Sequence, residues 1–279
     1  MDGPPSAEDI MIPLRSHVLE RPDAVIRYWT GGVSGAPTVV LLHGATLDHR
    51  SWQPQIDALH DRFRVVVTDL RGHGASTGVF DFDVAVEDIL TILKLEVDSA
   101  VVLVGLSLGG NIAQEVVRRQ PDLISGLVAA DSTCNSADRL PLAAASTAAA
   151  LRMHALWTRD GFARQAALAS SSEPRVQDYI MEANANRSTQ ETLDILNCLL
   201  TSALRPDRNY RLPVPALLIH GQHDRVGDIV NDMRTWARRE PGVTYAVIPN
   251  AGHTSNLDNP TVFTRLLIDF IDNLPEAAP

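Results

Sequence analysis

Short apolar runs alternate with amphipathic segments over most of the chain. Runs rich in β-branched residues predict strands buried on both faces, and an apolar residue at every third or fourth position predicts a helix. The predicted strands are 24–30, 38–42, 63–68, 100–104, 127–130, 216–220 and 244–248. The predicted helices are 52–59, 83–95, 108–119, 230–239 and 261–274. This alternation predicts an α/β fold, with a mainly parallel sheet and helices on both of its faces.

The alternation stops between residues 132 and 212. This stretch is rich in Ala and Ser and carries helical patterns but no clear strand. Structureless loops of that length are rare in compact domains, so we expect an inserted helical cap over 132–212. Residues 1–131 and 213–279 would then form the core. The alanine-rich segment 143–150 is expected to be cap helix, because alanine is the best helix former.

Composition narrows the class of protein. The 279 residues carry a formal net charge of −10, which argues against nucleic acid and anionic membranes as partners. No apolar run is long enough to span a bilayer, and the first residues lack the basic-then-apolar order of a signal peptide. The two cysteines, Cys134 and Cys198, are far apart in the sequence, so we expect both to be free thiols in a reducing compartment. We expect a cytoplasmic protein. The sequence leaves open whether it forms a homodimer.

Ser107 is the strongest candidate for chemistry. It is the serine of Gly105-Leu-Ser-Leu-Gly109, which fits G-x-S-x-G between a predicted strand and a predicted helix. A tight turn there lifts the hydroxyl clear of the backbone, and the two glycines let strand and helix approach closely. The alternative is a glycine-rich helix start that binds phosphate or only turns. The strand-to-helix context favours a nucleophile.

A serine nucleophile needs a base, and the base needs a carboxylate. His253 follows the last predicted strand, so it shares the carboxyl edge of the sheet with Ser107. Asp224 follows the strand 216–220 and gives the chain order Ser, Asp, His. Asp131, at the end of the strand 127–130, is a rival acid. Asp228 is a weaker rival, because it is expected to lie in the next helix.

The developing negative charge on a substrate oxygen needs two N–H donors. Leu108 N–H lies at the start of the helix after Ser107, and Ala45 N–H lies in the loop after the strand 38–42. We expect these two groups to form an oxyanion hole. His43 also stands in this loop, where we interpret it as shaping the loop and as a substrate-pocket candidate. The other pocket candidates are in the cap, at Met153, His154 and Trp157, with Leu156 and Phe162 as further lid residues.

The motifs together resemble the α/β-hydrolase family. They are His43-Gly44, Asp69-Leu-Arg-Gly-His-Gly74, Gly105 to Gly110, Gly221-Gln-His-Asp224 and Ala251-Gly-His253. The chain is most similar to the cap-bearing bacterial branch that contains esterases, enol-lactonases, carbon–carbon bond hydrolases and cofactor-free haloperoxidase-like enzymes. The resemblance implies an eight-stranded sheet and no cofactor. No residue cluster has the spacing of metal ligands, so no metal is expected either.

Two departures from the family's patterns bear on the reaction. Ser107 stands where dehalogenases and epoxide hydrolases of this branch carry aspartate, which argues against both activities. Another branch has the motif HGGG where this chain has His43-Gly44-Ala45-Thr46, and the bulkier residue after Gly44 favours small acyl or lactone substrates. We therefore expect hydrolysis of a carboxylic ester or lactone through an acyl-enzyme. Carbon–carbon bond hydrolysis, cofactor-free oxidation on the same three residues, and a non-catalytic ligand receptor are the alternatives.

Overall fold

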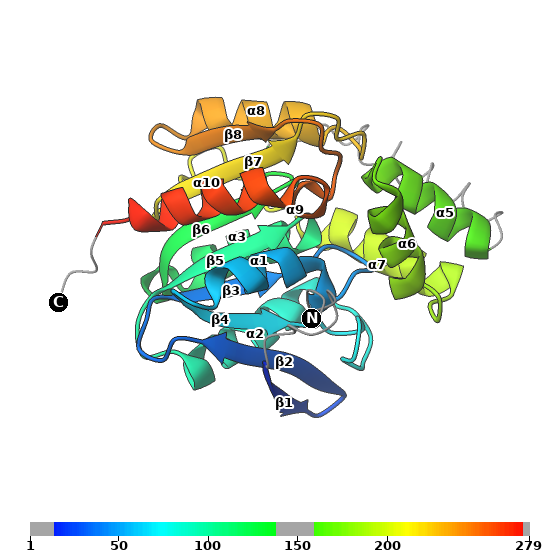
Figure 1. Cartoon of the computed structure of the whole chain (residues 1–279), viewed down its shortest axis with the longest axis horizontal. Coiled ribbons are helices and arrows are strands. Elements are labelled where there is room, and N and C mark those ends of the chain that lie inside the picture. The colour runs from blue at the N-terminus through cyan, green and yellow to red at the C-terminus, as the bar shows by residue number, and fades with distance from the viewer. Residues whose placement is uncertain (1–13, 138–158, 276–279) are drawn as a thin grey trace, which may run out of the picture.

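An eight-stranded sheet forms the centre of the molecule (Figure 1). The computed structural model describes residues 14–137 and 159–275. The strands, in chain order, are β1 (Arg15–Arg21), β2 (Ala24–Gly32), β3 (Thr38–Leu42), β4 (Arg64–Thr68), β5 (Val101–Leu106), β6 (Ile124–Ala130), β7 (Ala216–Gly221) and β8 (Thr244–Ile248). Their order across the sheet is β1-β2-β4-β3-β5-β6-β7-β8. This confirms the predicted fold class.

Six of the strands run parallel, and β1 and β2 form an antiparallel edge. β2 pairs with both β1 and β4 in antiparallel register, while every pair from β4 to β8 is parallel. The sequence pattern did not predict β1. Only Leu19 of this strand is buried, so its apolar signal is too weak to distinguish it from a polar leader.

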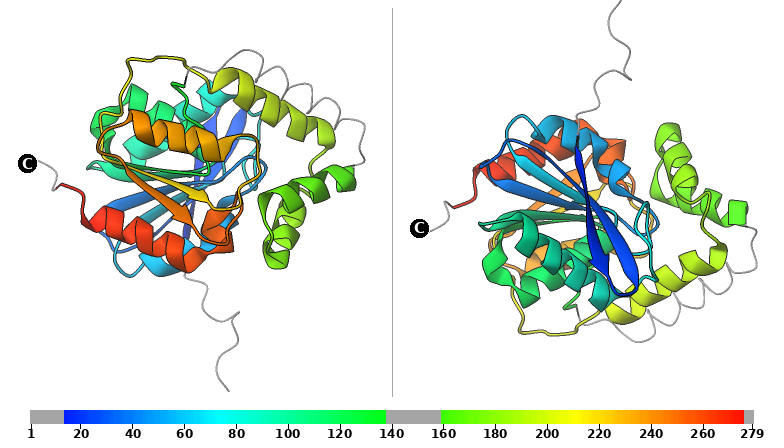
Figure 2. Two further views of the ribbon diagram at one scale, coloured as in Figure 1. Left: turned by 90° about the horizontal axis from the view of Figure 1, so that it is seen from above. Right: turned by 90° about the horizontal axis from the view of Figure 1, so that it is seen from below.

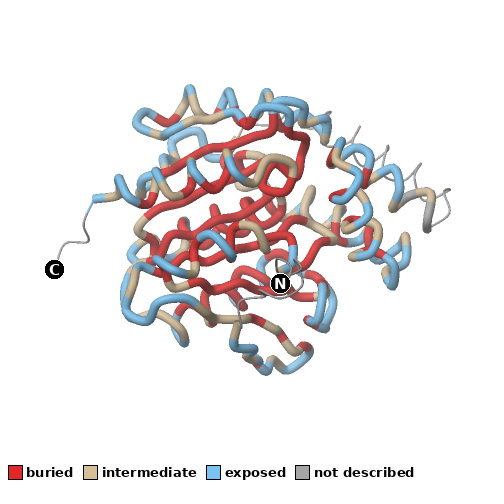
Figure 3. The backbone as a smooth tube through the Cα atoms, viewed as in Figure 1, coloured by how far each residue is buried: buried red, intermediate tan, exposed pale blue. Residues whose placement is uncertain are grey.

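Helices cover both faces of the sheet (Figure 2). α2 (Phe82–Glu96) and α3 (Leu108–Arg119) pack on one face with side chains such as Val40 and Leu103, and α8 (Ile229–Arg239) covers β7 on that side. α1 (Gln53–Leu59) and α10 (Pro260–Asp272) pack on the other face against Val39 and Leu41. Neighbouring residues of a strand point to opposite faces, so the β-branched runs fill both layers. Figure 3 shows the resulting buried centre.

A helical segment separates β6 from β7. It contains α5 (Arg159–Ser170), α6 (Pro174–Ala183) and α7 (Thr189–Ser202). α7 begins at a capping box, in which Ser188 and Glu191 satisfy each other's backbone N–H groups. The three helices lie together beyond one end of the sheet, the end to which the parallel strands point (Figures 1 and 2). The predicted boundaries of the cap, at residues 132 and 212, stay predictions. The cap helix expected over 143–150 also stays a prediction, because that segment lies outside the described residues.

Two smaller expectations concern thiols and membranes. Cys134 and Cys198 are both free, as predicted. Within the described ranges, no helix combines the length and the apolar character needed to cross a membrane.

Candidate active site

Backbone strain gathers where the parallel strands end. Four non-glycine residues in the described ranges have a positive φ, namely Thr46, Ser107, Asp131 and Asn250. They follow β3, β5, β6 and β8, so all four lie at the carboxyl edge of the sheet. A positive φ is an outlier for a β-branched residue such as Thr46 and costs of order 1–3 kcal/mol at such positions. Strain of this kind is typical of functional sites.

The turn between β5 and α3 has the strained geometry predicted for a nucleophile. Ser107 has φ 51° and ψ −116° and is the N-cap residue of α3. A Cβ on Gly105 would lie 2.3 Å from the backbone of Gly109, and a Cβ on Gly109 would lie 2.2 Å from the Leu42 carbonyl oxygen. Side chains at either position would force the strand and helix apart. The spacing of the motif therefore follows from the close approach of β3, β5 and α3.

We expect Gly109→Ala to destabilise the protein by at least about 2 kcal/mol, because the added methyl group collides with rigid strand backbone. Urea unfolding measures the change. Gly35→Ala is the control for backbone strain without a collision: Gly35, unlike Gly109, has a positive φ, and its Cβ would meet nothing within 4 Å. The control should lose only about 1 kcal/mol, the conformational penalty. Equal losses in the two variants would contradict the packing argument.

Ser107, His253 and Asp224 form a chain of hydrogen bonds. His253 Nε2 lies 2.9 Å from Ser107 Oγ, and His253 Nδ1 lies 2.9 Å from Asp224 Oδ2. The other oxygen of Asp224 accepts the Val226 N–H at 2.8 Å, which fixes the carboxylate. A ring held in this way donates from Nδ1 to the carboxylate and leaves Nε2 free to accept the serine proton.

The environment of His253 favours a base that can hold a positive charge. Burial alone would lower the pKa of His253, but the opposite charge and hydrogen bond of Asp224 outweigh it. With smaller contributions from Asp131 and Asp258, the pKa of His253 is raised above its ordinary value of 6.5. The Asp224 side chain is fully buried, so little solvent screens this attraction.

The two rival acids make other contacts. Asp131 Oδ1 accepts the Gly221 N–H at 2.7 Å, and its Oδ2 accepts the hydroxyl of Ser255. Burial and the nearby negative charge of Asp224 raise the pKa of Asp131 to about 8. Asp228 lies at the N-terminus of α8, where it accepts from the Asn231 amide. Among the described residues, neither is hydrogen-bonded to the His253 ring, whereas Asp224 is, so Asp224 is the acid that we propose.

The residues predicted to form an oxyanion hole lie beside Ser107. A Cβ on Gly44 would lie 3.5 Å from Ser107 Cβ, which places the loop of Ala45 against the serine. Leu108 N–H is the first amide of α3. Neither the Ala45 N–H nor the Leu108 N–H donates to another group of the described residues. Two unused amides beside a serine are suited to receive an oxygen.

His43 is corrected as a pocket residue. It is fully buried. Its Nδ1 lies 2.8 Å from the Gly44 carbonyl, and its Nε2 accepts the Leu70 N–H. With both ring nitrogens engaged by backbone, His43 shapes the loop, as its position at the end of β3 suggested. The pocket and lid candidates of the cap lie outside the described residues, namely Met153, His154, Leu156, Trp157 and the side chain of Phe162.

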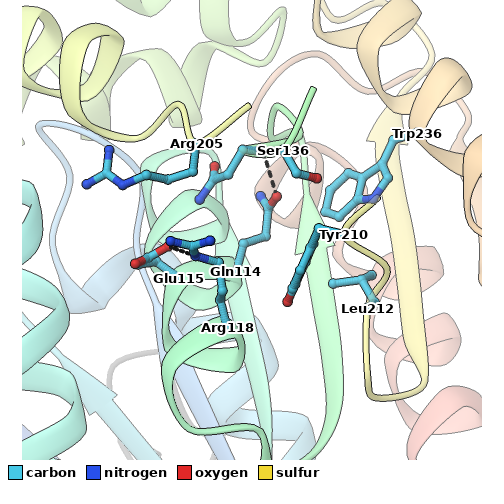
Figure 4. Close-up of a pocket in the computed structure, with 9 residues that line it drawn as sticks. Gln114, Glu115, Arg118, Ser136, Arg205, Tyr210, Leu212 and Trp236 are labelled. Atoms are coloured by element: carbon cyan, nitrogen blue, oxygen red, sulfur yellow. Dashed lines mark hydrogen bonds and ion pairs between the residues drawn. The ribbon is translucent and has the colours of Figure 1, made fainter. Parts of the chain in front are cut away.

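One hollow lies away from Ser107 (Figure 4). None of Ser107, Asp224 or His253 lines it. Gln114 and Arg118 of α3 face Tyr210 and Trp236 across it. A second, small hollow lies between the inserted helices and the loop after β3, with Thr46 in its wall. Only the second hollow adjoins the loop that carries the Ala45 amide.

The sequence did not point to the groups that hold the His253 loop. The Asp258 carboxylate accepts the Gly252 N–H at 2.7 Å, and the Ser170 carbonyl at the end of α5 accepts the Thr254 N–H at 3.1 Å. Asp258 lies in the four-residue helix α9 (Ser255–Asp258), which is too short to show helical periodicity. No motif signals Ser170, because its contribution comes from the backbone. The inserted segment is thus bonded directly to the histidine loop.

Comparisons with known proteins identify the family of the chain. The family model described as "Alpha/beta hydrolase family" matches residues 39–266. The chain is 27% identical to 2-(acetamidomethylene)succinate hydrolase of Mesorhizobium japonicum over 85% of this chain and 88% of the relative. It is 26% identical to pimeloyl-[acyl-carrier protein] methyl ester esterase of Pectobacterium carotovorum, over 87% and 97%. The crystal structure of the enol-lactonase of Burkholderia xenovorans LB400 superimposes with a TM-score of 0.75 at 25% identity, over 90% and 97%. With most of its length matched by the family model, the chain belongs to the alpha/beta hydrolase family.

Proposed function

We propose that the protein is a serine hydrolase that cleaves a carboxylic ester or a lactone. The observation that carries the proposal is the hydrogen-bond chain from Ser107 Oγ through His253 to Asp224, with both distances 2.9 Å. The names of two similar proteins, a methyl ester esterase and an enol-lactonase, support the same substrate class. The catalytic residues proposed are Ser107, His253 and Asp224.

The proposed reaction has two halves. His253 Nε2 takes the proton of Ser107 as Oγ forms a bond to the substrate carbonyl carbon. The Ala45 and Leu108 amides stabilise the negative oxygen that results. The carbonyl carbon then releases the alcohol, which leaves with the proton from His253, and an acyl-enzyme on Ser107 remains. In the second half, water gives its proton to His253, attacks the acyl carbon and displaces Ser107, which regains a proton.

The helices α5, α6 and α7 are proposed to belong to a cap over residues 132–212. Their place at the carboxyl end of the strands supports this assignment, because ligands of parallel sheets bind at that edge. The hydrogen bond from Thr254 to Ser170 also links the cap to the loop of the proposed base. A substrate would enter between the cap and this edge.

A substrate panel tests the reaction class. p-Nitrophenyl acetate, a set of γ- and δ-lactones, and vinylogous diketones are compared by kcat/KM. We expect turnover of the ester or of a lactone, and at least 10-fold lower kcat/KM for the diketones. Preferential cleavage of a diketone would instead establish carbon–carbon bond hydrolysis. Absence of turnover with every substrate, with a folded protein, would contradict the proposal and favour a receptor.

A further inference from the structure

The second hollow contains an arginine, Arg187, that forms no ion pair with a carboxylate of the described residues, although Glu191 attracts its charge from beyond ion-pair distance. Arg187 follows α6, and its Nη1 donates to the Gly72 carbonyl at 2.9 Å. Its Nε is buried and has no hydrogen-bond partner. Among the residues that the structure describes, no carboxylate lies within ion-pair distance of the Arg187 guanidinium. Glu191, one turn further on, is engaged at its own helix start by Ser188.

Arg50, on the same side of the sheet, is already neutralised. It lies 2.8 Å from the Asp48 carboxylate and 2.6 Å from the Glu182 carboxylate. The charge of Arg50 is therefore balanced within the protein, by the buried Asp48 and by Glu182 of α6. Arg187 differs because it is partly buried and, within the described part of the chain, belongs to no ion pair. Burial lowers the pKa of Arg187, but an arginine in a protein keeps its proton at neutral pH.

The lining of the hollow suits a small polar group. Its wall carries hydroxyl and amide groups, which belong to Thr46, Asn184, Thr189 and Thr192. Two alanines of α5 complete the wall and leave space. Thr46 is the residue after Ala45, so the hollow begins beside the proposed oxyanion donor. A carboxylate is the group that a guanidinium binds most specifically, through two parallel hydrogen bonds. Because the net charge of −10 repels anions at long range, a local cation would favour the binding of an anionic substrate.

We propose that Arg187 binds a carboxylate of the substrate, so that the enzyme acts on acidic esters or lactones. This inference rests on the proposed function, since it assigns a substrate class to the same site. Arg187 acts in it as a binding residue and takes no part in bond making.

Two matched substrate pairs test the inference. p-Nitrophenyl hydrogen glutarate carries a carboxylate on the acyl side, and its methyl ester is the neutral counterpart. 4-Acetoxybenzoate carries a carboxylate on the alcohol side, and methyl 4-acetoxybenzoate is its counterpart. In at least one pair, the unmodified protein should prefer the acid. Arg187→Met should lower kcat/KM for that acid about 10- to 100-fold, mainly through KM, and change the neutral member less than about 3-fold.

Two further variants separate charge from structure. Arg187→Lys should recover part of the preference for the acid that Arg187→Met loses. The ammonium group keeps the positive charge but lacks the two parallel N–H donors of the guanidinium. Arg164→Met, at an exposed position of α5, should leave both ratios unchanged. Ratios measured on one preparation are unaffected by partial misfolding. Equal losses for acid and neutral substrates, or no loss in either pair, would overturn the inference.

The failure of this inference is distinguishable from failure of the proposed function. If Ser107→Ala abolishes hydrolysis of the neutral esters while Arg187→Met shows no selectivity, the function stands and the carboxylate site is wrong. If Ser107→Ala leaves the neutral esters unaffected, the proposed function itself is wrong. If the unmodified protein hydrolyses neither these four esters nor any lactone of the panel, the result counts against both; if it hydrolyses only neutral lactones, the carboxylate site alone is wrong.

Discussion

Ser107→Ala is expected to lower kcat for ester or lactone hydrolysis about 10⁶-fold. The substitution removes Oγ, the atom that lies 2.9 Å from His253 Nε2 and that would form the acyl-enzyme. Binding of the substrate should change little, so KM should stay within about 3-fold. Initial rates with the best substrate of the panel, measured over a range of substrate concentrations at a known enzyme concentration, give both parameters.

Ser132→Ala is the matched control for Ser107→Ala. The Ser132 hydroxyl donates to the Ser107 carbonyl at 2.9 Å, so it lies beside the same turn but points to the backbone. Its loss should cost about 1 kcal/mol of stability and less than 10-fold in kcat. Retention of more than about a hundredth of the activity in Ser107→Ala would contradict a covalent role for this serine.

Asp224→Asn is expected to lower kcat about 10⁴-fold. The amide is nearly the same size, but it loses the negative charge that stabilises the protonated His253 ring. It can also hold the ring in the tautomer with the proton on Nε2, which cannot accept a proton from Ser107. Asp131→Asn should cost far less activity per folded molecule, because Asp131 contacts Gly221 and Ser255 rather than the ring.

The pH profile gives an independent readout of the same pair. Hydrolysis needs His253 without its second proton, so kcat/KM falls as the pH drops through the pKa of His253. Because Asp224 raises that pKa above 6.5, the acid limb of the unmodified protein should have its midpoint above 6.5. The midpoint should fall in Asp224→Asn, where the raising charge is gone. A 10⁴-fold loss in Asp131→Asn with a mild effect in Asp224→Asn would reverse the assignment of the acid.

The strands and the turn at Ser107 could be predicted because their signals are local. Buried parallel strands need continuous apolar runs, and the close approach of β3, β5 and α3 requires Gly105 and Gly109. The edge strand β1 gave no such signal, since one of its faces meets solvent. His253 could be assigned to the carboxyl edge of the sheet from the sequence, because all the parallel strands point the same way.

The choice between the two acids could not be made from the sequence. Asp131 and Asp224 both follow strands at the carboxyl edge, and only the directions of their side chains separate them. Those directions depend on Ser255 and Gly221, which are far from Asp131 in the chain. The same holds for Arg187, because an unpaired charge is defined by the absence of neighbours brought in from other elements. Local pattern carries no information about such long-range contacts.

The central claim, that Ser107 is the nucleophile, is tested most directly by trapping it with a fluorophosphonate. The protein is treated with one probe, its intact mass is measured, and the modified peptide is sequenced by tandem mass spectrometry. Addition of one phosphonyl group, located on Ser107 and lost in Ser107→Ala and in heat-denatured protein, is the predicted result. A folded protein that gains no label, or one that carries the label on another residue, would contradict the claim.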